Sequence, residues 1–267
     1  VSLTKPADTY RMRYRGGGGY PSPGMIIDYY LPAAASAKLQ VDIVQKGKVI
    51  RSFIPQKSKK KKEEKETDMA TGFYPQGATA SLVNEPGAHR FRWDLRHQPA
   101  KHKGRSSYGN SGPVVAPGSY TIRLTIDGEQ LEQTALVKMD PRVAAAGVTQ
   151  QDLLAQEQLS LNVSSLLDDA RSLSKKLKDK KEKLEKMTEA DDDKQLEISK
   201  MESVQQQLVT DEGRYQQPML IDQLRYLKSM LDRADQRPGK DAYDRYAELK
   251  RIYDELAPQV STGDTDD

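Results

Sequence analysis

The segment from residue 112 to residue 143 constrains the fold of this chain more than any other part of it. Between residues 120 and 126 apolar and polar side chains alternate strictly, and this period of two predicts a half-buried strand. The apolar positions are Tyr120, Ile122, Leu124 and Ile126. Asp127 and Gly128 then predict a turn, because glycine accepts a positive φ without a Cβ clash. Residues 131–138 are predicted to return as a second strand, which completes a β-hairpin without catalytic chemistry.

Shorter strands are predicted before this hairpin. Segments rich in β-branched and aromatic residues predict strands at 25–31, 39–44, 49–54 and 88–95. In the last of these, apolar neighbours two residues away on each side favour Trp93 as a core anchor over an exposed sugar-binding platform. Strands joined by hairpins or loops, with no crossover helices, predict an antiparallel Ig-like β-sandwich over residues 25–143.

Polar segments surround the predicted strands. Residues 1–24, which include glycines at 16–19, are expected to be an extended linker. Residues 55–86 are expected to form a long mobile loop. Within that loop the lysine run 59–62 is followed at once by acidic residues, so the local field nearly cancels. We therefore expect a solvated loop there rather than a nucleic-acid contact.

The second half of the chain has the periodicity of helices. Thr149, followed three residues later by Asp152, resembles a capping box. Beyond it, apolar residues recur at alternating steps of four and three, which predicts one long helix whose seam faces a partner. These seam positions are Leu159, Val163, Leu166, Ala170, Leu173, Leu177, Leu184 and Met187.

Three further helices are predicted after the long one. The first buries Leu196, Met201, Val204 and Leu208; the second covers 219–233; the third is capped by Asp241. Their short connections favour an antiparallel helical bundle at 149–258 over a coiled-coil dimer of the long helix. Residues 259–267 are expected to be a disordered acidic tail. The predicted fold class is therefore α+β with two domains, a sandwich and a bundle.

Charge divides the chain near residue 145. Residues 1–145 hold 23 Lys or Arg and 13 Asp or Glu, whereas residues 146–267 hold 19 and 26. A break of this kind is typical of a domain boundary. The sequence has no long apolar run, so no membrane span is expected, and no cysteine, so it can form no disulfide. It starts with Val1, and we expect a fragment or a processed piece of a longer protein, from which an export signal could have been lost.

No catalytic, cofactor-binding or metal-binding residue is predicted. The glycines at 16–19 lack the Lys-Ser/Thr pair of a phosphate loop, and 191–193 lacks the spacing of a calcium loop. The histidines have no cysteine or second helical histidine to complete a metal site. The remaining candidate is a ligand-binding loop at 97–115, because aromatic and polar side chains on a loop over a rigid scaffold favour binding. Its candidate residues are Tyr108, Arg105 and His102.

Four segments resemble a known family. They are GMIIDYYL (24–31), GAHRFRWDLRH (87–97), APGSYTIRLTIDG with LVKMDPRV (116–143), and QPMLIDQLRYLKSMLDRADQRPGKDAYDRYAELK (217–250). The chain is similar over about residues 20–258 to the C-terminal region of large exported bacterial proteins. Those proteins carry sortilin-like or BNR-type β-propeller repeats and are often described as glycosyl hydrolases.

The resemblance implies an Ig-like domain similar to that of the flagellar hook-capping protein, followed by helices. It also implies a location in the periplasm or on the surface of a Gram-negative bacterium. The glycan or peptide site of the family lies in its propellers, and this sequence contains no propeller repeat and no Asp-box. No catalytic residue can therefore be transferred to any position of this chain, although the parent protein is expected to be glycosyl hydrolase-like.

Three functions remain open at this point. The first is a non-catalytic accessory module that contacts the N-terminal β-propeller of the same parent protein or another envelope protein. The second is a carbohydrate-binding module that uses the 97–115 loop, and the third and weakest is a hydrolase. No cofactor and no nucleic-acid partner are expected for any of them.

Overall fold

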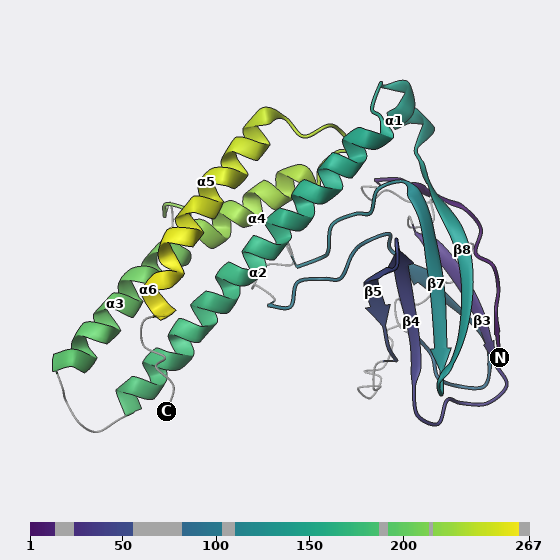
Figure 1. Cartoon of the computed structure of the whole chain (residues 1–267), viewed down its shortest axis with the longest axis horizontal. Coiled ribbons are helices and arrows are strands. Elements are labelled where there is room, and N and C mark those ends of the chain that lie inside the picture. The colour runs from purple at the N-terminus through teal and green to yellow at the C-terminus, as the bar shows by residue number, and fades with distance from the viewer. Residues whose placement is uncertain (14–23, 56–81, 103–109, 187–191, 214–215, 262–267) are drawn as a thin grey trace, which may run out of the picture. The chain divides into compact units, whose positions relative to one another are not determined.

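The computed structural model describes residues 1–13, 24–55, 82–102, 110–186, 192–213 and 216–261 (Figure 1). The fold is α+β, with β-sheets formed by the first half of the chain and helices by the second half. The chain divides into two compact units. The first contains residues 1–98 and 114–154, and the second contains residues 99–113 and 155–267. The predicted mobile loop lies largely outside the described residues, since 56–81 are not among them.

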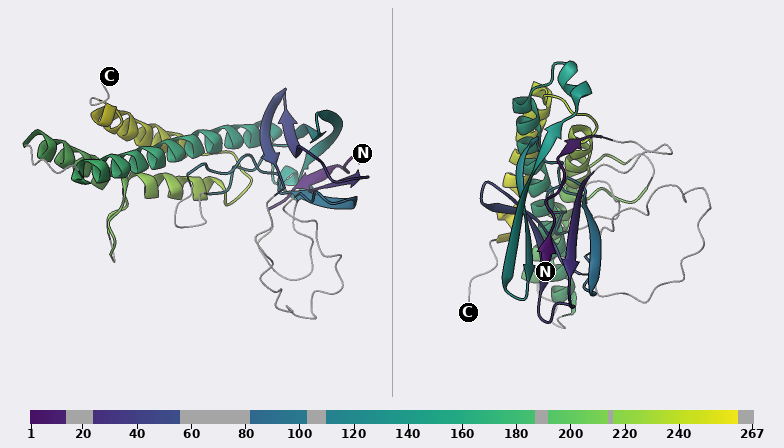
Figure 2. Two further views of the ribbon diagram at one scale, coloured as in Figure 1. Left: turned by 90° about the horizontal axis from the view of Figure 1, so that it is seen from below. Right: turned by 90° about the vertical axis from the view of Figure 1, so that its right-hand side faces the viewer.

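The strands of the first unit form two sheets. Their bounds are β1 (Ser2–Leu3), β2 (Thr9–Arg11), β3 (Met25–Leu31), β4 (Leu39–Gln45), β5 (Lys48–Phe53), β6 (Gly87–Trp93), β7 (Gly118–Ile126) and β8 (Glu129–Met139). One sheet has the order β1-β3-β6 and the other β2-β8-β7-β4-β5. Neighbouring strands are antiparallel except β2 and β8, which are parallel. The right-hand view of Figure 2 shows the two sheets facing each other.

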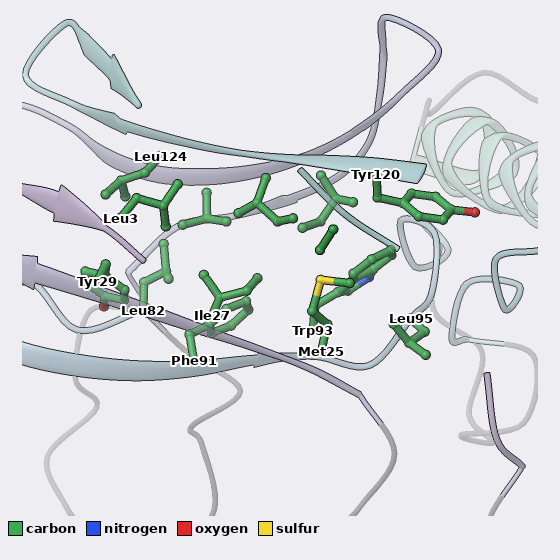
Figure 3. Close-up of a cluster of buried hydrophobic side chains, with 14 of the residues drawn as sticks. Leu3, Met25, Ile27, Tyr29, Leu82, Phe91, Trp93, Leu95, Tyr120 and Leu124 are labelled. Atoms are coloured by element: carbon green, nitrogen blue, oxygen red, sulfur yellow. The ribbon is translucent and has the colours of Figure 1, made fainter. Parts of the chain in front are cut away.

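A single hydrophobic core lies between the two sheets (Figure 3). Trp93 of β6 is 0% exposed, and its ring centroid lies 5.3 Å from that of Tyr120 on β7. Its indole Nε1 donates a hydrogen bond to the carbonyl oxygen of Arg96 at 2.9 Å. The polar end of a buried indole needs such a partner. The prediction of Trp93 as a core anchor is confirmed, and an exposed sugar-binding platform at this residue is excluded.

The predicted β-hairpin is present as β7 and β8. Residues 118–126 pair with residues 129–137, and the side chains of Tyr120, Ile122 and Leu124 are buried. Asp127 and Gly128 have φ values of 48° and 98°. Positive φ at both central residues is the geometry of a two-residue type I′ turn, whose twist matches that of the flanking strands.

The carboxylate of Asp127 also fastens this turn to the segment that precedes β4. It accepts hydrogen bonds from the backbone N–H groups of Ser36, Ala37 and Lys38 at 2.9, 2.8 and 3.0 Å. The Ser36 hydroxyl donates to it as well, at 3.0 Å. The Ser36 amide, followed by those of Lys38 and Ala37, lowers the pKa of the Asp127 carboxyl well below its usual range. Donors to the charged form favour ionisation.

We expect Asp127→Asn to lower the melting temperature at neutral pH, because a neutral amide is a weaker acceptor for these backbone donors. The folded-state pKa of Asp127 is lowered. Its stabilisation is therefore present above the unfolded-state pKa of about 3.9 and is lost as the pH falls through the folded value. Thermal denaturation of both proteins across acidic pH checks this. A difference in melting temperature that stays constant down to the most acidic pH would contradict the assignment.

The helices follow the strands in sequence. Their bounds are α1 (Pro141–Ala145), α2 (Gln150–Lys186), α3 (Asp192–Leu208), α4 (Leu220–Leu231), α5 (Lys240–Leu256) and α6 (Pro258–Ser261). The predicted capping box precedes α2. The backbone N–H of Asp152 donates to Thr149 Oγ1 at 3.1 Å, and the N–H of Thr149 donates to Asp152 Oδ2 at 3.0 Å. No helix in the described part of the chain combines the length and apolar character needed to cross a membrane.

A second hydrophobic core joins α2, α3, α4 and α5. The seam of α2 is buried from Leu159 to Leu177, Leu184 is partly buried against the same core, and Met187 lies outside the described residues. The residues that cover the seam come from the same chain. They are Met201, Val204 and Leu208 of α3, Leu220, Leu224, Leu227 and Leu231 of α4, and Leu249 and Leu256 of α5.

Three local predictions differ from the structure. The short strands β1 and β2 lie within residues 1–24, where a linker without regular structure was expected; β2 exists because it pairs with the distant β8. Leu196 is 55% exposed near the start of α3, and it does not join the core. Asp241 is not the cap of α5. Gly239 holds that position without a side-chain bond, and Asp241 lies in the first turn.

The end of the chain also differs in part from the expectation. Pro258 to Ser261 form α6, although a disordered tail was expected from residue 259. Pro258 is placed at the first position of this helix, where its missing N–H has no intrahelical partner to lose. Residues 262–267 lie outside the described part of the chain.

Candidate functional site

Of the three predicted ligand-binding residues, the structure describes only His102. Arg105 and Tyr108 lie outside the described residues. Residues 99–113 belong to the second unit, with the helices, rather than to the unit that contains the sheets. The predicted loop is therefore attached to a different scaffold from the one that the sequence indicated.

Two polar residues of α2 hold the described ends of this loop. The carboxylate of Asp168 accepts hydrogen bonds from the backbone N–H groups of Lys101 and His102, at 2.8 and 3.0 Å. Arg171 lies almost one helical turn later, and its Nη1 donates to the carbonyl oxygen of His102 at 2.9 Å and to Asn110 Oδ1 at 3.2 Å. Asp168 and Arg171 therefore fix the two sides of the loop. The sequence offered no signal for this, because an acid and a base three residues apart resemble any exposed helix face.

Polar groups of Arg171 and His102 that hold the loop are buried, so they are poorly accessible to a ligand. Arg171 is only 8% exposed, and burial lowers the pKa of its guanidinium group, with Asp168 opposing that shift. The Nδ1 atom of His102 is also buried and makes no hydrogen bond. It lies 3.9 Å from Asp168 Oδ1. These contacts indicate a role in packing the loop, and carbohydrate binding by His102, Arg105 and Tyr108 stays a prediction.

A different feature of the second unit offers an accessible binding surface. A groove with a volume of about 1120 Å³ is lined by residues of α4, by residues within 210–213 and 216–218, and by the start of α5. We call this feature the α4 groove. His102, the one predicted ligand-binding residue that the structure describes, does not line it. The lining includes Leu227 and Leu231, which also belong to the helical core.

Two large side chains of α4 are open to solvent at the α4 groove. Tyr226 is 63% exposed and Met230 is 42% exposed. They are four residues apart, so they lie side by side on one face of the helix. The buried leucines of α4 occupy another face. The sequence contains a signal for this pair, because Tyr226 and Met230 are large side chains that fall outside the leucine stripe of this helix.

Hydrogen bonds hold the walls of the α4 groove in place. The backbone N–H of Met219 donates to Thr210 Oγ1 at 2.9 Å, which fastens the segment before α4. Gln223 donates from Nε2 to the carbonyl oxygen of Pro218 and accepts from Arg245 Nη2 of α5 at 2.8 Å. Gln156 of α2 donates to the carbonyl oxygens of Leu231 and Ala234, which lie at the end of α4. The last carbonyls of a helix lack intrahelical partners, so these bonds stabilise that end.

The charged residues of the α4 groove are not equally engaged. Arg225 forms an ion pair with Asp222 at 3.1 Å, and Arg245 forms one with Glu248 at 2.6 Å. Arg233 also interacts within the chain. Asp211 and Asp241 line the same groove, and neither forms an ion pair or hydrogen bond with any residue that the structure describes. Among the described residues of this groove, the charge that remains unpaired is therefore negative.

Comparisons with protein-family models, curated proteins and solved structures found no match for this chain. The resemblance to exported β-propeller proteins therefore stays a prediction. Over the described ranges, no group of three or more His, Cys, Asp or Glu side chains is arranged to hold a metal ion.

Proposed function

We propose that this chain is a non-catalytic interaction module of a larger exported β-propeller protein, acting in domain orientation and protein docking at the cell envelope. The observation that carries the docking role is the exposure of Tyr226 and Met230 at the α4 groove. Tyr, Met and Arg are enriched at the centres of protein interfaces, and rigid aromatic side chains often dominate their binding energy.

The strand order supports an Ig-like sandwich as the fold of the first unit. In such domains the last two strands pair with the third in one sheet, and the first two strands lie with the fifth in the other. The neighbours of β8, β7 and β4, and those of β1, β3 and β6, agree with this arrangement. Tyr120 on β7 donates from its hydroxyl to the carbonyl oxygen of Ala116 at 2.6 Å. That bond resembles the tyrosine corner of Ig-like domains.

In this proposal the two units have different roles. The Ig-like unit caps or orients the neighbouring propeller domains. The helical unit, an antiparallel bundle around α2, is the arm that contacts a partner. The envelope location and the propeller partner rest on the family resemblance of the sequence, whereas the docking role rests on the α4 groove.

The docking role predicts that a double variant, Tyr226→Ala with Met230→Ala, loses partners that the wild-type chain retains. Both side chains are exposed, so truncation should leave the fold intact. The measurement is affinity capture from a cell-envelope extract by immobilised wild-type and variant chains, quantified by mass spectrometry. We expect at least one protein to fall about tenfold or more in recovery, as for loss of an interface hot spot.

Tyr243→Ala is the matched control for this capture. Tyr243 is 43% exposed on α5 and does not line the α4 groove, so its removal should leave recovery unchanged. Equal melting temperatures of the three proteins would show that folding is preserved. The docking role fails if the double variant recovers the same proteins as the wild-type chain.

A further inference from the structure

The charged residues of the α4 groove indicate which class of partner can bind there. We infer that the groove binds a cationic peptide segment, in which Lys or Arg residues flank an apolar side chain. This inference rests on the proposed docking function and adds to it the chemical class of the partner.

The apolar part of the segment fits the exposed side chains of α4. Tyr226 and Met230 lie about one helical turn apart, and Leu227 lines the same groove. An apolar side chain placed against them loses its contact with water, which favours binding in proportion to the area covered. The unbranched Met230 thioether adjusts its shape to what it contacts, and so the groove can accept aliphatic side chains of different form.

The cationic part of the segment fits the acidic residues that remain available. The carboxylates of Asp211 and Asp241 line the groove and have no partner among the described residues, whereas Arg225 and Arg245 are paired with acids of the same chain. A Lys or Arg of the partner can approach these carboxylates without displacing an ion pair between described residues. The exposed ring of Tyr226 adds a face on which a cation is attracted.

The wider surroundings act in the same direction. Residues 146–267 hold 19 Lys or Arg and 26 Asp or Glu, so the half of the chain that carries the groove has a net negative charge. Such a field raises the association rate of a cationic partner and lowers that of an anionic one. An acidic segment would have to compete with Asp222 and Glu248 for Arg225 and Arg245. It would also be repelled by Asp211 and Asp241, which line the same groove. Repulsion between like charges would therefore weaken the binding of an acidic segment relative to a cationic one.

The test is fluorescence anisotropy with short labelled peptides and the full chain. The probe has lysines on both sides of a single leucine, and its analogues replace lysine by glutamate or by serine. We expect the lysine peptide to bind at least about tenfold more tightly than either analogue, with an affinity that falls as salt is added. Tyr226→Ala should weaken binding of the lysine peptide about tenfold.

Charge variants separate the groove from the general acidity of the helical unit. The double variant Asp211→Asn with Asp241→Asn should weaken binding of the lysine peptide about tenfold. Asp169→Asn with Asp179→Asn removes the same charge from exposed positions of α2 outside the groove, and it should bind as the wild-type chain does. Melting temperatures of both double variants verify folding, since Asp241 also lies in the first turn of α5.

The outcomes distinguish this inference from the proposed function. Equal binding of the lysine and glutamate peptides, or equal loss in both charge variants, would overturn the cationic partner. Binding of a neutral oligosaccharide that depends on Tyr226, without binding of the lysine peptide, would overturn it as well. If the lysine peptide fails while Tyr226-dependent capture of an envelope protein succeeds, the docking function survives and the partner has another chemistry.

Discussion

Replacing Trp93 by alanine should lower the free energy of unfolding of the first unit by about 3–5 kcal/mol, the range for large aromatic residues in well-packed cores. The side chain is 0% exposed and lies edge-on to the ring of Tyr120. Trp93 belongs to β6 of the three-stranded sheet, whereas Tyr120 belongs to β7 of the five-stranded sheet. The alanine variant would leave a cavity between the two sheets and would remove the hydrogen bond that the indole N–H donates to the carbonyl oxygen of Arg96.

Hydrogen exchange of the β7 amides measures this loss, because exchange through global opening of the unit reports its stability. Trp93→Phe keeps a ring in the core and should cost less, about 1–2 kcal/mol, mainly through the lost hydrogen bond and smaller volume. Tyr30→Ala is a surface control on β3, where Tyr30 is 48% exposed. Protection of β7 in Trp93→Ala equal to that in Tyr30→Ala would show that the indole does not hold the sheets together.

The burial of Trp93 was predictable from the sequence, because it depends on a local pattern of apolar and polar residues. Alternation over residues 91–95 and over 120–126 is local information, and the buried faces follow from it. β2 was missed because its three residues carry no pattern of their own and become a strand through pairing with β8. The clamp of Asp127 on residues 36–38 was missed for the same reason, since the turn was recognised locally but its partner lies far away in the sequence.

The candidate site was less predictable than the fold. The sequence drew attention to Tyr108 and its neighbours because they are aromatic and polar residues on a loop. The α4 groove instead combines Asp211, Tyr226 and Asp241 from three separate segments. The leucine periodicity predicted which face of α4 is buried. Tyr226 does not belong to that face, so its exposure also follows from the sequence. The periodicity could not predict that residues within 210–213 and 216–218, together with the start of α5, line a groove beside that exposed face.

One charged residue of α4, Lys228, lies on the buried face of the helix together with the leucines. Lys228 is 1% exposed, although a lysine on a short amphipathic helix is expected at the surface. Its Nζ forms an ion pair with Asp232 Oδ2 at 2.8 Å, and Asp232 lies just beyond the last residue of α4. A cation near the end of a helix is favoured by the helix dipole, and the carboxylate compensates part of the cost of burying the ammonium group.

The two halves of this pair should therefore respond differently to substitution. Asp232→Ala leaves the buried ammonium without its carboxylate, and we expect it to lower the free energy of unfolding of the helical unit by about 2–3 kcal/mol. Lys228→Met removes the buried charge and keeps a similar volume, so we expect a change of less than about 1 kcal/mol or a gain in stability. Urea denaturation followed by helical circular dichroism measures both.

The double variant completes this comparison. If the cost of Asp232→Ala comes from the uncompensated ammonium group, then adding Lys228→Met should restore most of the lost stability. If Asp232 instead stabilises the end of α4 independently of Lys228, the double variant should be as unstable as Asp232→Ala alone. A Lys228→Met variant that is itself destabilised as much as Asp232→Ala would mean that the lysine stabilises the helical core, and that its burial is not a cost offset by Asp232.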